Sequence, residues 1–274
     1  MRGGDLTLQD AADALGVHYM TVYRYVRLGL LPAERRGRSW VVRHQDLDSF
    51  VAERSEPVGP GTRRSVDWTA RLQRRLLAGD RVGTKNVVDA ALTAGSDPVD
   101  VYVDVVAGAM RGIGAAWEAG RCDVAHEHRA SVIMTQVLGV LDSRFTRRGV
   151  RRGVVVAGCA PGERHALPLR IVADVVRLSG WEVEDLGADV PVDSLVRAAS
   201  EADRLVAVAV SATTAGNELA AARSVEAVRG AVSAPVLLGG GAVPDEATAR
   251  RLGADGWASD ARGVVGLLQS LPVG

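Results

Sequence analysis

The chain of 274 residues lacks the features that would place it in a membrane, an oxidising compartment or a strongly charged complex. Its two cysteines, Cys122 and Cys159, are too few for the disulfide framework of a secreted domain. It has no run of 18 apolar residues and no apolar signal-sequence core near its start, so we expect a cytoplasmic protein that is neither exported nor membrane-spanning. Its 33 basic and 33 acidic side chains cancel, so any nucleic-acid surface must be a local basic patch.

What the chain does have is apolar sequence in several distinct patterns. Hydrophobic residues make up 47% of it, which is enough for more than one core. The pattern divides it into residues 1–54, a linker over residues 55–66, residues 67–148 and residues 149–274. The linker, SEPVGPGTRRSV, is rich in Pro, Gly and charge and has no periodicity. We therefore expect a multidomain protein of α and α/β domains.

The first domain has the pattern of a helix-turn-helix followed by a hairpin. Thr7 can cap a helix over residues 8–15, and a turn containing glycine separates it from a second helix over residues 19–28. Two short strands around Glu34 and residues 40–42 follow, and then a helix over residues 45–54. The candidate DNA contacts are on the polar side of the second helix and on the hairpin tip: Tyr19, Thr21, Arg24, Arg27, Arg36 and Arg38.

This stretch, LTLQDAADALGVHYMTVYRYVRLGLLPAERRGRSWVVRHQDLDSFV, resembles the excisionase/MerR-type winged helix-turn-helix family. The resemblance implies a double-stranded operator DNA partner. One unit of this size buries too little DNA surface for a specific site, so we expect a homo-oligomer, a dimer or a tetramer. A small helical interaction domain with a solvated basic face is the alternative.

The third segment is helical throughout, and its spacing predicts a four-helix bundle. The expected helices are residues 68–77, 84–94, 98–118 and 125–145. Trp117 is followed nine residues later by Glu127 and His128. Periodicity places the tryptophan at a helix end and the Glu-His pair in the first turn of the next helix, where the helix dipole favours a carboxylate in any case.

The last segment alternates strands with helices, which predicts a flavodoxin-like, doubly wound parallel sheet. The expected strands are residues 154–156, 181–185, 204–210, 234–238 and 256–258. Glu163 and His165 follow the first of them, at the edge where open α/β sheets bind ligands. A carboxylate two residues before an imidazole can hold one ring nitrogen and leave the other for a metal, although the residues alone favour an ordinary surface-loop histidine.

Three motifs at strand ends, E-x-H-x-x-P, S-x-T and GGG, resemble the signature of the cobalamin-binding domain family, D/E-x-H-x-x-G, S-x-L/T and GG. The resemblance implies that His165 is the lower cobalt ligand and that Glu163 orients it. It further implies that the displaced nucleotide tail of the cofactor is lined by four residues: Ser211, Thr213, Gly239 and Gly240. Pro168 stands where the family has its closing glycine.

The Trp117 to Glu127-His128 spacing resembles the bundle of CarH/LitR-type light-sensing transcriptional regulators. In that family the bundle covers the upper face of adenosylcobalamin, which implies that Trp117 packs on the 5′-deoxyadenosyl group and that Glu127 and His128 bound its pocket. Glu118 departs from the family, whose light-sensing members have a histidine there that can take the upper cobalt position.

The resemblance implies a transcriptional regulator, not an enzyme, in which dark adenosylcobalamin stabilises an oligomer on DNA. Light then cleaves the cobalt–carbon bond, the oligomer falls apart and the operator is released. Three alternatives share some of these motifs: a light-independent sensor of cobalamin or of redox state, a corrinoid methyltransferase subunit, and a DNA-binding protein whose C-terminal half holds another ligand or none. The N-terminal winged helix and the absence of a substrate-binding barrel argue against the methyltransferase subunit.

Overall fold

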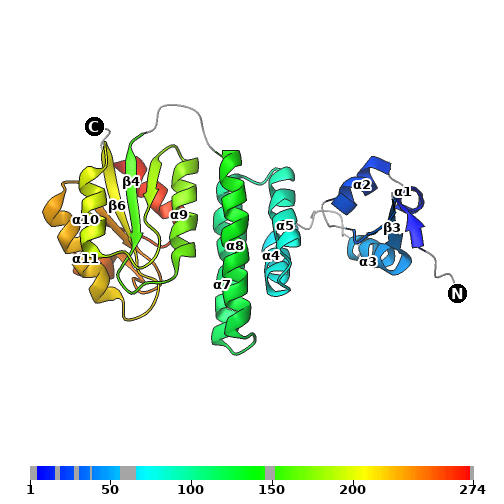
Figure 1. Cartoon of the computed structure of the whole chain (residues 1–274), viewed down its shortest axis with the longest axis horizontal. Coiled ribbons are helices and arrows are strands. Elements are labelled where there is room, and N and C mark those ends of the chain that lie inside the picture. The colour runs from blue at the N-terminus through cyan, green and yellow to red at the C-terminus, as the bar shows by residue number, and fades with distance from the viewer. Residues whose placement is uncertain are drawn as a thin grey trace. The chain divides into compact units, whose positions relative to one another are not determined.

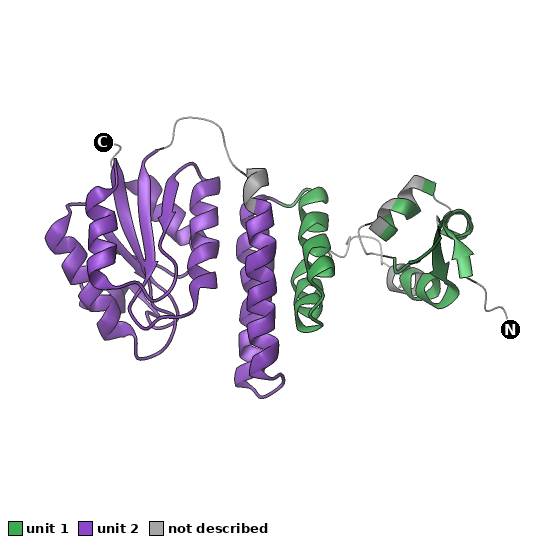
Figure 2. Ribbon diagram, viewed as in Figure 1, with its two compact units in different colours: residues 1–96 green, residues 97–274 purple. Residues whose placement is uncertain are grey.

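A computed structural model describes residues 5–15, 19–27, 31–37, 39–55, 66–145 and 152–271, without the side chains at positions 20, 21, 24, 27, 51–55 and 142–145. The chain forms two compact units, residues 1–96 and residues 97–274 (Figure 2). The boundary falls inside the segment expected to form one four-helix bundle. We therefore describe the helices of each unit separately, and the single bundle stays a prediction.

The first unit begins with a small sheet and three helices. In chain order these are β1 (Asp5–Thr7), α1 (Leu8–Leu15), α2 (Tyr19–Arg27), β2 (Glu34–Arg36), β3 (Ser39–Arg43) and α3 (His44–Ser55) (Figure 1). The strands are antiparallel in the order β1-β3-β2. Thr7 caps α1 as predicted: its Oγ1 accepts from the Asp10 N–H, while Asp10 accepts from the Thr7 N–H. Strand β1, which periodicity did not predict, completes the sheet.

Two further helices follow in the same unit, α4 (Trp68–Leu77) and α5 (Arg81–Thr93). Each begins at an aspartate whose carboxylate accepts a backbone N–H of the first turn, Asp67 from Ala70 and Asp80 from Gly83. The cap at Asp80 explains why α5 begins three residues earlier than the expected helix. The two helices pack along buried apolar residues that include Leu72, Leu76 and Val88.

The second unit opens with a long helical run and its antiparallel neighbour. The run comprises α6 (Pro98–Asp100), a π-helical segment η1 (Val101–Val106) and α7 (Ala107–Glu118); α8 (Val124–Phe145) follows. The run covers the same residues as the predicted helix over 98–118, but its π-helical segment has no signature in the sequence pattern. Arg262 joins this run to the rest of the unit through ion pairs with Asp100 and Asp104.

The remainder of the unit is a five-stranded parallel sheet covered on both faces. Its strands are β4 (Val154–Cys159), β5 (Glu182–Asp185), β6 (Leu205–Ser211), β7 (Val236–Gly239) and β8 (Gly256–Ala258). They lie in the order β5-β4-β6-β7-β8, which confirms the doubly wound sheet. The covering helices are α9 (Ala166–Leu178), α10 (Val192–Glu201), α11 (Glu218–Ala231), α12 (Glu246–Arg251) and α13 (Ala261–Ser270).

Two buried clusters, one on each face, hold the sheet between its helices. Leu169, Val176 and Leu268 pack with alternate residues of β4 and β6 under α9 and α13. Leu195 and Val225 pack with the other residues of these strands under α10 and α11. Strands that are buried on both faces are rich in Val and Ala, as a parallel sheet requires. No helix among the described residues is long and apolar enough to cross a membrane.

Candidate cofactor-binding site

The loop after β4 presents a histidine on top of a buried carboxylate. The strand ends at Cys159, a turn with Gly162 at φ 83° follows, and His165 is the N-cap residue of α9. Glu163 is fully buried, whereas the His165 side chain is 56% exposed. The His165 Nδ1 lies 2.7 Å from Glu163 Oε1, and the His165 backbone N–H donates to the same oxygen at 2.9 Å.

The Glu163 carboxylate also joins this loop to the loop between β6 and α11. Its Oε2 accepts the backbone N–H groups of Thr213 and Thr214, both at 2.6 Å. The Thr214 hydroxyl lies 3.1 Å from Oε1 and from His165 Nδ1, and the Asn217 amide reaches Oε2 at 3.4 Å. One carboxylate thus satisfies donors from two loops that are about fifty residues apart in the chain, which fixes the histidine against the edge of the sheet.

Hydrogen bonding keeps this buried carboxylate ionised. Burial alone would raise the pKa of Glu163, but the hydrogen bonds from Thr214, His165 and Thr213 outweigh burial and lower the pKa to about 2. An ionised carboxylate only accepts hydrogen bonds, so it selects the His165 tautomer that carries its proton on Nδ1. The Nε2 lone pair is therefore the one that remains for a metal.

The protein itself supplies few ligands for such a metal. Among the described residues no three His, Cys, Asp or Glu side chains gather as a metal cluster. Cys159 lies nearby, but burial and the negative charges of Glu163 and Asp185 raise the pKa of its thiol to about 12, so it stays protonated and packs in the core. An arrangement with one histidine ligand fits a metal that arrives already held by a cofactor.

An apolar cavity of about 130 Å³ opens beside the carboxyl ends of β6 and β7. Ser211, Gly239 and Gly240 line it, as does Pro168, the residue that departs from the family signature. Thr213, the fourth predicted member, is not part of the lining. Its backbone N–H binds Glu163, and its Oγ1 is buried without a hydrogen-bond partner within the described part of the chain.

The glycines at this edge let three backbone segments come close together. A Cβ on Gly240, whose φ is 107°, would lie 2.3 Å from the Ala212 carbonyl oxygen, and one on Gly239 would lie 2.6 Å from that of Ala258. A side chain at either position would therefore push the strand ends apart. An apolar cavity beside glycines at the sheet edge fits an organic group inserted there, so the residues are compatible with the nucleotide tail of a corrinoid.

The end of the α7–α8 hairpin carries the other predicted contacts. Trp117 is 45% exposed in the last turn of α7. Glu127 Oε2 lies 2.6 Å from His128 Nδ1, and Glu127 Oε1 accepts from the Ser131 hydroxyl at 2.8 Å. The structure thus brings Glu127 and His128 together and leaves an indole exposed at the adjoining helix end. Glu118, exposed, ends α7.

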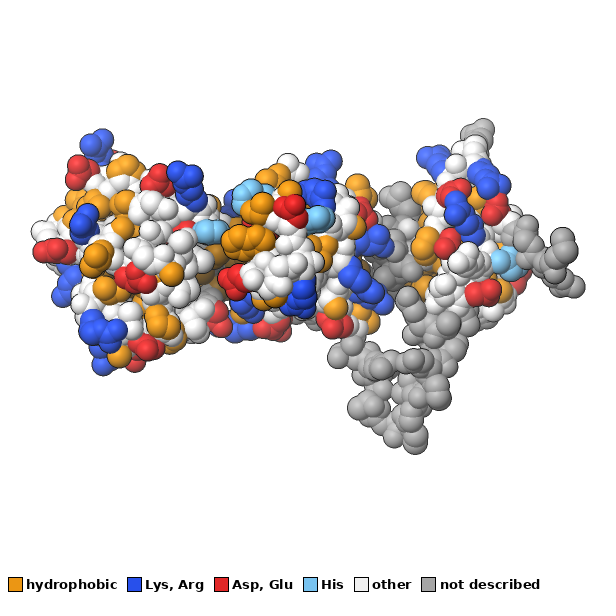
Figure 3. Space-filling model, turned by 90° about the horizontal axis from the view of Figure 1, so that it is seen from below, with side chains coloured by type: hydrophobic (Ala, Val, Ile, Leu, Met, Phe, Trp, Pro, Cys, Tyr) orange, Lys and Arg blue, Asp and Glu red, His pale blue; other side chains and the backbone are white. Residues whose placement is uncertain are grey.

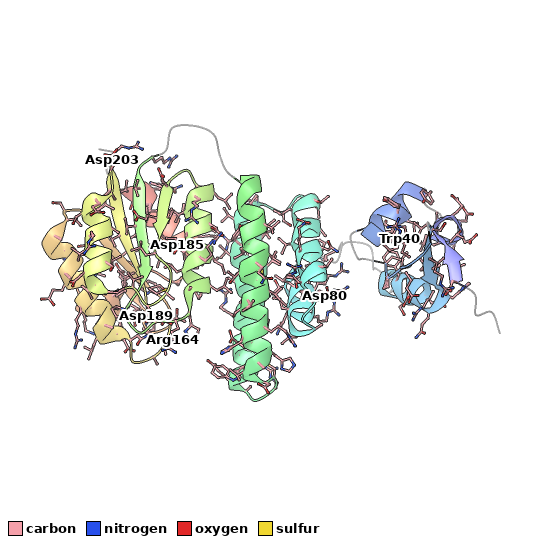
Figure 4. All side chains as sticks on the ribbon, viewed as in Figure 1. Trp40, Asp80, Arg164, Asp185, Asp189 and Asp203 are labelled. Carbon is pink, nitrogen blue, oxygen red and sulfur yellow. The ribbon has the colours of Figure 1, made fainter. Side chains whose placement is uncertain are left out.

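The end of the α7–α8 hairpin and the loop between β4 and α9 that carries Glu163 and His165, here called the histidine loop, lie at the same end of the second unit. In Figure 1 the strands of the sheet run downward, and the turn between α7 and α8 lies below their carboxyl ends. Figure 4 labels Arg164 and Asp189 at this lower edge and Asp203 at the opposite one. The view from below in Figure 3 shows histidine side chains at the surface of this end. The residues predicted to contact the cofactor on the hairpin and on the sheet therefore lie at the same end of the unit.

The predicted DNA contacts are described only in part. Tyr19 is exposed and stacks on Tyr23 with ring centroids 6.4 Å apart. Arg36 is exposed on β2 and pairs with Asp5 at 2.5 Å. The side chains of Thr21, Arg24 and Arg27, and all of Arg38, lie outside the described residues. Their contact with DNA stays a prediction.

Sequence reasoning missed Thr214 and Asn217, which complete the hydrogen bonding of Glu163. Both belong to the loop that follows the S-x-T motif, and Asn217 is the N-cap residue of α11. Polar residues after the carboxyl end of a neighbouring parallel strand were an available signal, because such ends meet at one edge.

An exposed histidine held by a buried carboxylate, beside an apolar slot at the edge of a flavodoxin-like sheet, is the arrangement expected of a cobalamin-binding domain. Family comparison supports this class: residues 68–142 and residues 153–265 each match a B12 binding domain, and residues 6–55 match a helix-turn-helix domain. The chain thus contains B12-binding domains behind an N-terminal helix-turn-helix domain, and cobalamin binding is supported.

The similar proteins are named as corrinoid proteins. Trimethylamine corrinoid protein 2 of Methanosarcina acetivorans is 28% identical over 198 residues, which cover 70% of this chain and 90% of the relative. Trimethylamine corrinoid protein 1 of Methanosarcina mazei is 29% identical over 65% of this chain and 85% of the relative. The structure of the Methanosarcina barkeri monomethylamine corrinoid protein shares the fold, with a TM-score of 0.65 at 20% identity over 75% of this chain and 99% of that one.

Proposed function

We propose that the protein is an adenosylcobalamin-dependent transcriptional regulator of the cytoplasm that binds operator DNA as an oligomer and releases it in light. It acts by binding and not as an enzyme. The observation that supports this proposal best is the joining of a helix-turn-helix domain at residues 6–55 to B12-binding domains in one chain. A corrinoid carrier that only serves a methyltransferase has no need of a DNA-binding domain.

The adenosyl form is proposed because of the hairpin end. An indole that is 45% exposed at the end of α7 and a Glu-His pair in the first turn of α8 offer a flat apolar surface and polar groups for an adenosine moiety. This end of α7 and α8 faces the same side as the carboxyl edge of the sheet (Figure 1). Trp117, Glu127 and His128 would therefore bind the upper group while His165 holds the metal from below.

The residues of the chain make the histidine loop rigid and leave the hairpin end open. Glu163 fixes the ring and tautomer of His165 before any ligand arrives. The bound cofactor supplies a cobalt–carbon bond that light can cleave. The hairpin end can respond to the loss of the upper group because the Trp117 side chain, in the last turn of α7, is 45% exposed and is not enclosed by the protein. The cofactor can shift the equilibrium between the oligomer and the dissociated protein only by as much as its affinities for these two states differ.

A second candidate is a corrinoid protein of methyl transfer, and the comparisons favour it for the 65–70% of the chain that the relatives cover. The relatives named above are methylamine corrinoid proteins at 28–29% identity. In that case the helix-turn-helix domain would have a separate use, and Trp117 would face a methyl group, for which an adenosine-sized surface is unnecessary. A light-independent cobalamin or redox sensor is the third possibility, and Glu118 in place of histidine is its support.

The deciding experiment compares one reconstituted sample before and after green light. The purified chain is loaded with adenosylcobalamin in darkness, and its absorption spectrum, its size by gel filtration and its DNA binding are measured in both states. We expect a base-off spectrum with histidine ligation, an oligomer that dissociates on illumination and a loss of DNA binding of more than tenfold. His165→Ala should lose the histidine signature, and Arg223→Ala, on the exposed side of α11, is the matched control.

Each other outcome contradicts a different part of the proposal. Cobalamin binding with an unchanged assembly and unchanged DNA affinity after light would make the protein a chemical sensor. Methyl transfer from a methylamine to the bound corrinoid, after chemical reduction to cob(I)alamin and with a methylamine methyltransferase added, would establish the second candidate if no DNA binding is seen. Failure to bind any corrinoid would refute the cofactor site.

A further inference from the structure

The apolar cavity at the sheet edge has a third wall that comes from the helical run and not from the α/β domain. Two of its walls are the strand ends with α9 and the start of α13. The third consists of Val103, Ala107 and Arg111, which are spaced four residues apart along η1 and α7. Any group in the cavity is therefore bounded by both parts of the second unit.

Two charged residues line this cavity, and only one of them makes a hydrogen bond within the described part of the chain. Asp260 is the N-cap of α13, and its Oδ1 accepts the Gly263 N–H at 2.9 Å. Arg111 is exposed, and within the described part of the chain its side chain makes no hydrogen bond or ion pair. The cavity thus has an apolar interior and one available guanidinium at its side.

The wall that bears Arg111 is held in place by a separate set of charges. Arg262, at the start of α13, donates to Asp104 at 2.7 and 2.8 Å and to Asp100 at 2.6 Å. These bonds tie the helical run to α13, the same helix whose first turn borders the cavity. Arg111 therefore keeps its place at the cavity without taking part in the ion pairs itself.

We propose that Arg111 binds the phosphodiester of the nucleotide tail of a complete cobalamin, so that the chain selects corrinoids that have this tail. The apolar cavity suits the base of the tail, and the phosphodiester beside it has one negative charge. A guanidinium can bind two phosphate oxygens at once, which a lysine cannot do. The inference rests on the cobalamin binding described above.

The test uses two ligands that differ in the tail alone, adenosylcobalamin and adenosylcobinamide. Each is titrated in darkness into the full-length protein and its variants, and the dissociation constants are obtained from absorption changes. For Arg111→Ala we expect about tenfold weaker binding of adenosylcobalamin and less than a twofold change for adenosylcobinamide. Arg111→Lys should recover part of the loss. The cost of displacing the base from cobalt is common to all variants and cancels.

Arg223→Ala removes an equal charge from the opposite side of the sheet and should change neither affinity. Equal weakening of both ligands by Arg111→Ala would overturn the proposal, because it would mean a structural role for the residue, for example through its field on Asp104. Unchanged affinity for both would also overturn it. If the unaltered protein binds neither corrinoid, the cofactor assignment fails instead, so the two failures are distinguishable.

Discussion

The histidine loop and the β2–β3 hairpin of the helix-turn-helix domain, here called the wing, place their charged side chains in opposite environments. At the loop one carboxylate is fully buried and accepts hydrogen bonds from three backbone N–H groups. At the wing, Arg36 pairs with Asp5 and Arg43 pairs with Glu34, and these side chains are 28–62% exposed. The hydrogen bonds of the buried carboxylate fix the histidine loop before a ligand binds. The ion pairs of the wing are exposed to water, so their arginines can exchange an acidic partner for another anion.

This difference indicates which interactions give each region its affinity for a ligand. A preorganised histidine can bind a metal without paying to order its side chain. The wing has basic residues for phosphate, but each of these two pairs places an acid beside its arginine, and water screens the rest. Affinity for DNA would then come from several domains acting together, since joining weak sites in one assembly raises their combined affinity.

The largest effect is expected from removing the charge of the buried carboxylate. Glu163→Gln keeps the shape but places an amide N–H₂ against the donors of Thr213 and Thr214. Leaving such buried donors unsatisfied should lower the free energy of unfolding by about 3 kcal/mol. Urea unfolding followed by tryptophan fluorescence measures this loss, and cobalamin titration should show that the histidine-ligated spectrum is weakened.

Asp203→Asn provides the control for that substitution. Asp203 is exposed at the opposite edge of the sheet (Figure 4), so the same chemical change should leave stability within about 0.5 kcal/mol of the unaltered protein. If Glu163→Gln were as mild as this control, the hydrogen bonds of the carboxylate would add no net stability, and the contrast between loop and wing would fail.

Acid should remove the same stabilisation gradually. The pKa of Glu163 is lowered from 4.5 to about 2, so its contribution is fully present above pH 4.5 and is lost as the pH falls toward 2. A shift of this size corresponds to about 3 kcal/mol at neutral pH. Unfolding curves at pH 7, 4 and 2.5 should show the unaltered protein approaching Glu163→Gln in stability. A difference that stays constant over this range would contradict the pKa.

Much of this arrangement could be predicted from local pattern. Five strands at their correct places, and the contact between Glu163 and His165, follow from β-branched runs and from a two-residue spacing at a strand end. The helical run over residues 98–118 was predicted from its apolar period. These features depend on neighbours in the chain, and a single sequence contains that information.

What could not be predicted depends on contacts across the chain. Thr214 and Asn217 meet Glu163 because two loops about fifty residues apart share one sheet edge. The π-helical turns of η1 change hydrogen bonding without a change in composition. Arg111 was indistinguishable from any exposed helical arginine until the fold placed it at the cavity. Whether the four helices form one bundle also depends on such distant packing, and it stays a prediction.

The smallest expected effect concerns the wing, and it tests the other side of the comparison. Asp5→Asn frees Arg36, and Glu34→Gln frees Arg43, while all the arginines remain. If these arginines contact phosphate, each substitution should strengthen DNA binding about threefold, and the affinity should fall more steeply with added salt. Fluorescence anisotropy with labelled DNA at several salt concentrations measures both. Asp48→Asn, on the exposed face of α3, changes the net charge equally. An equal gain with Asp48→Asn would mean that net charge, and not the wing, sets the affinity, because only the wing substitutions release an arginine from a partner.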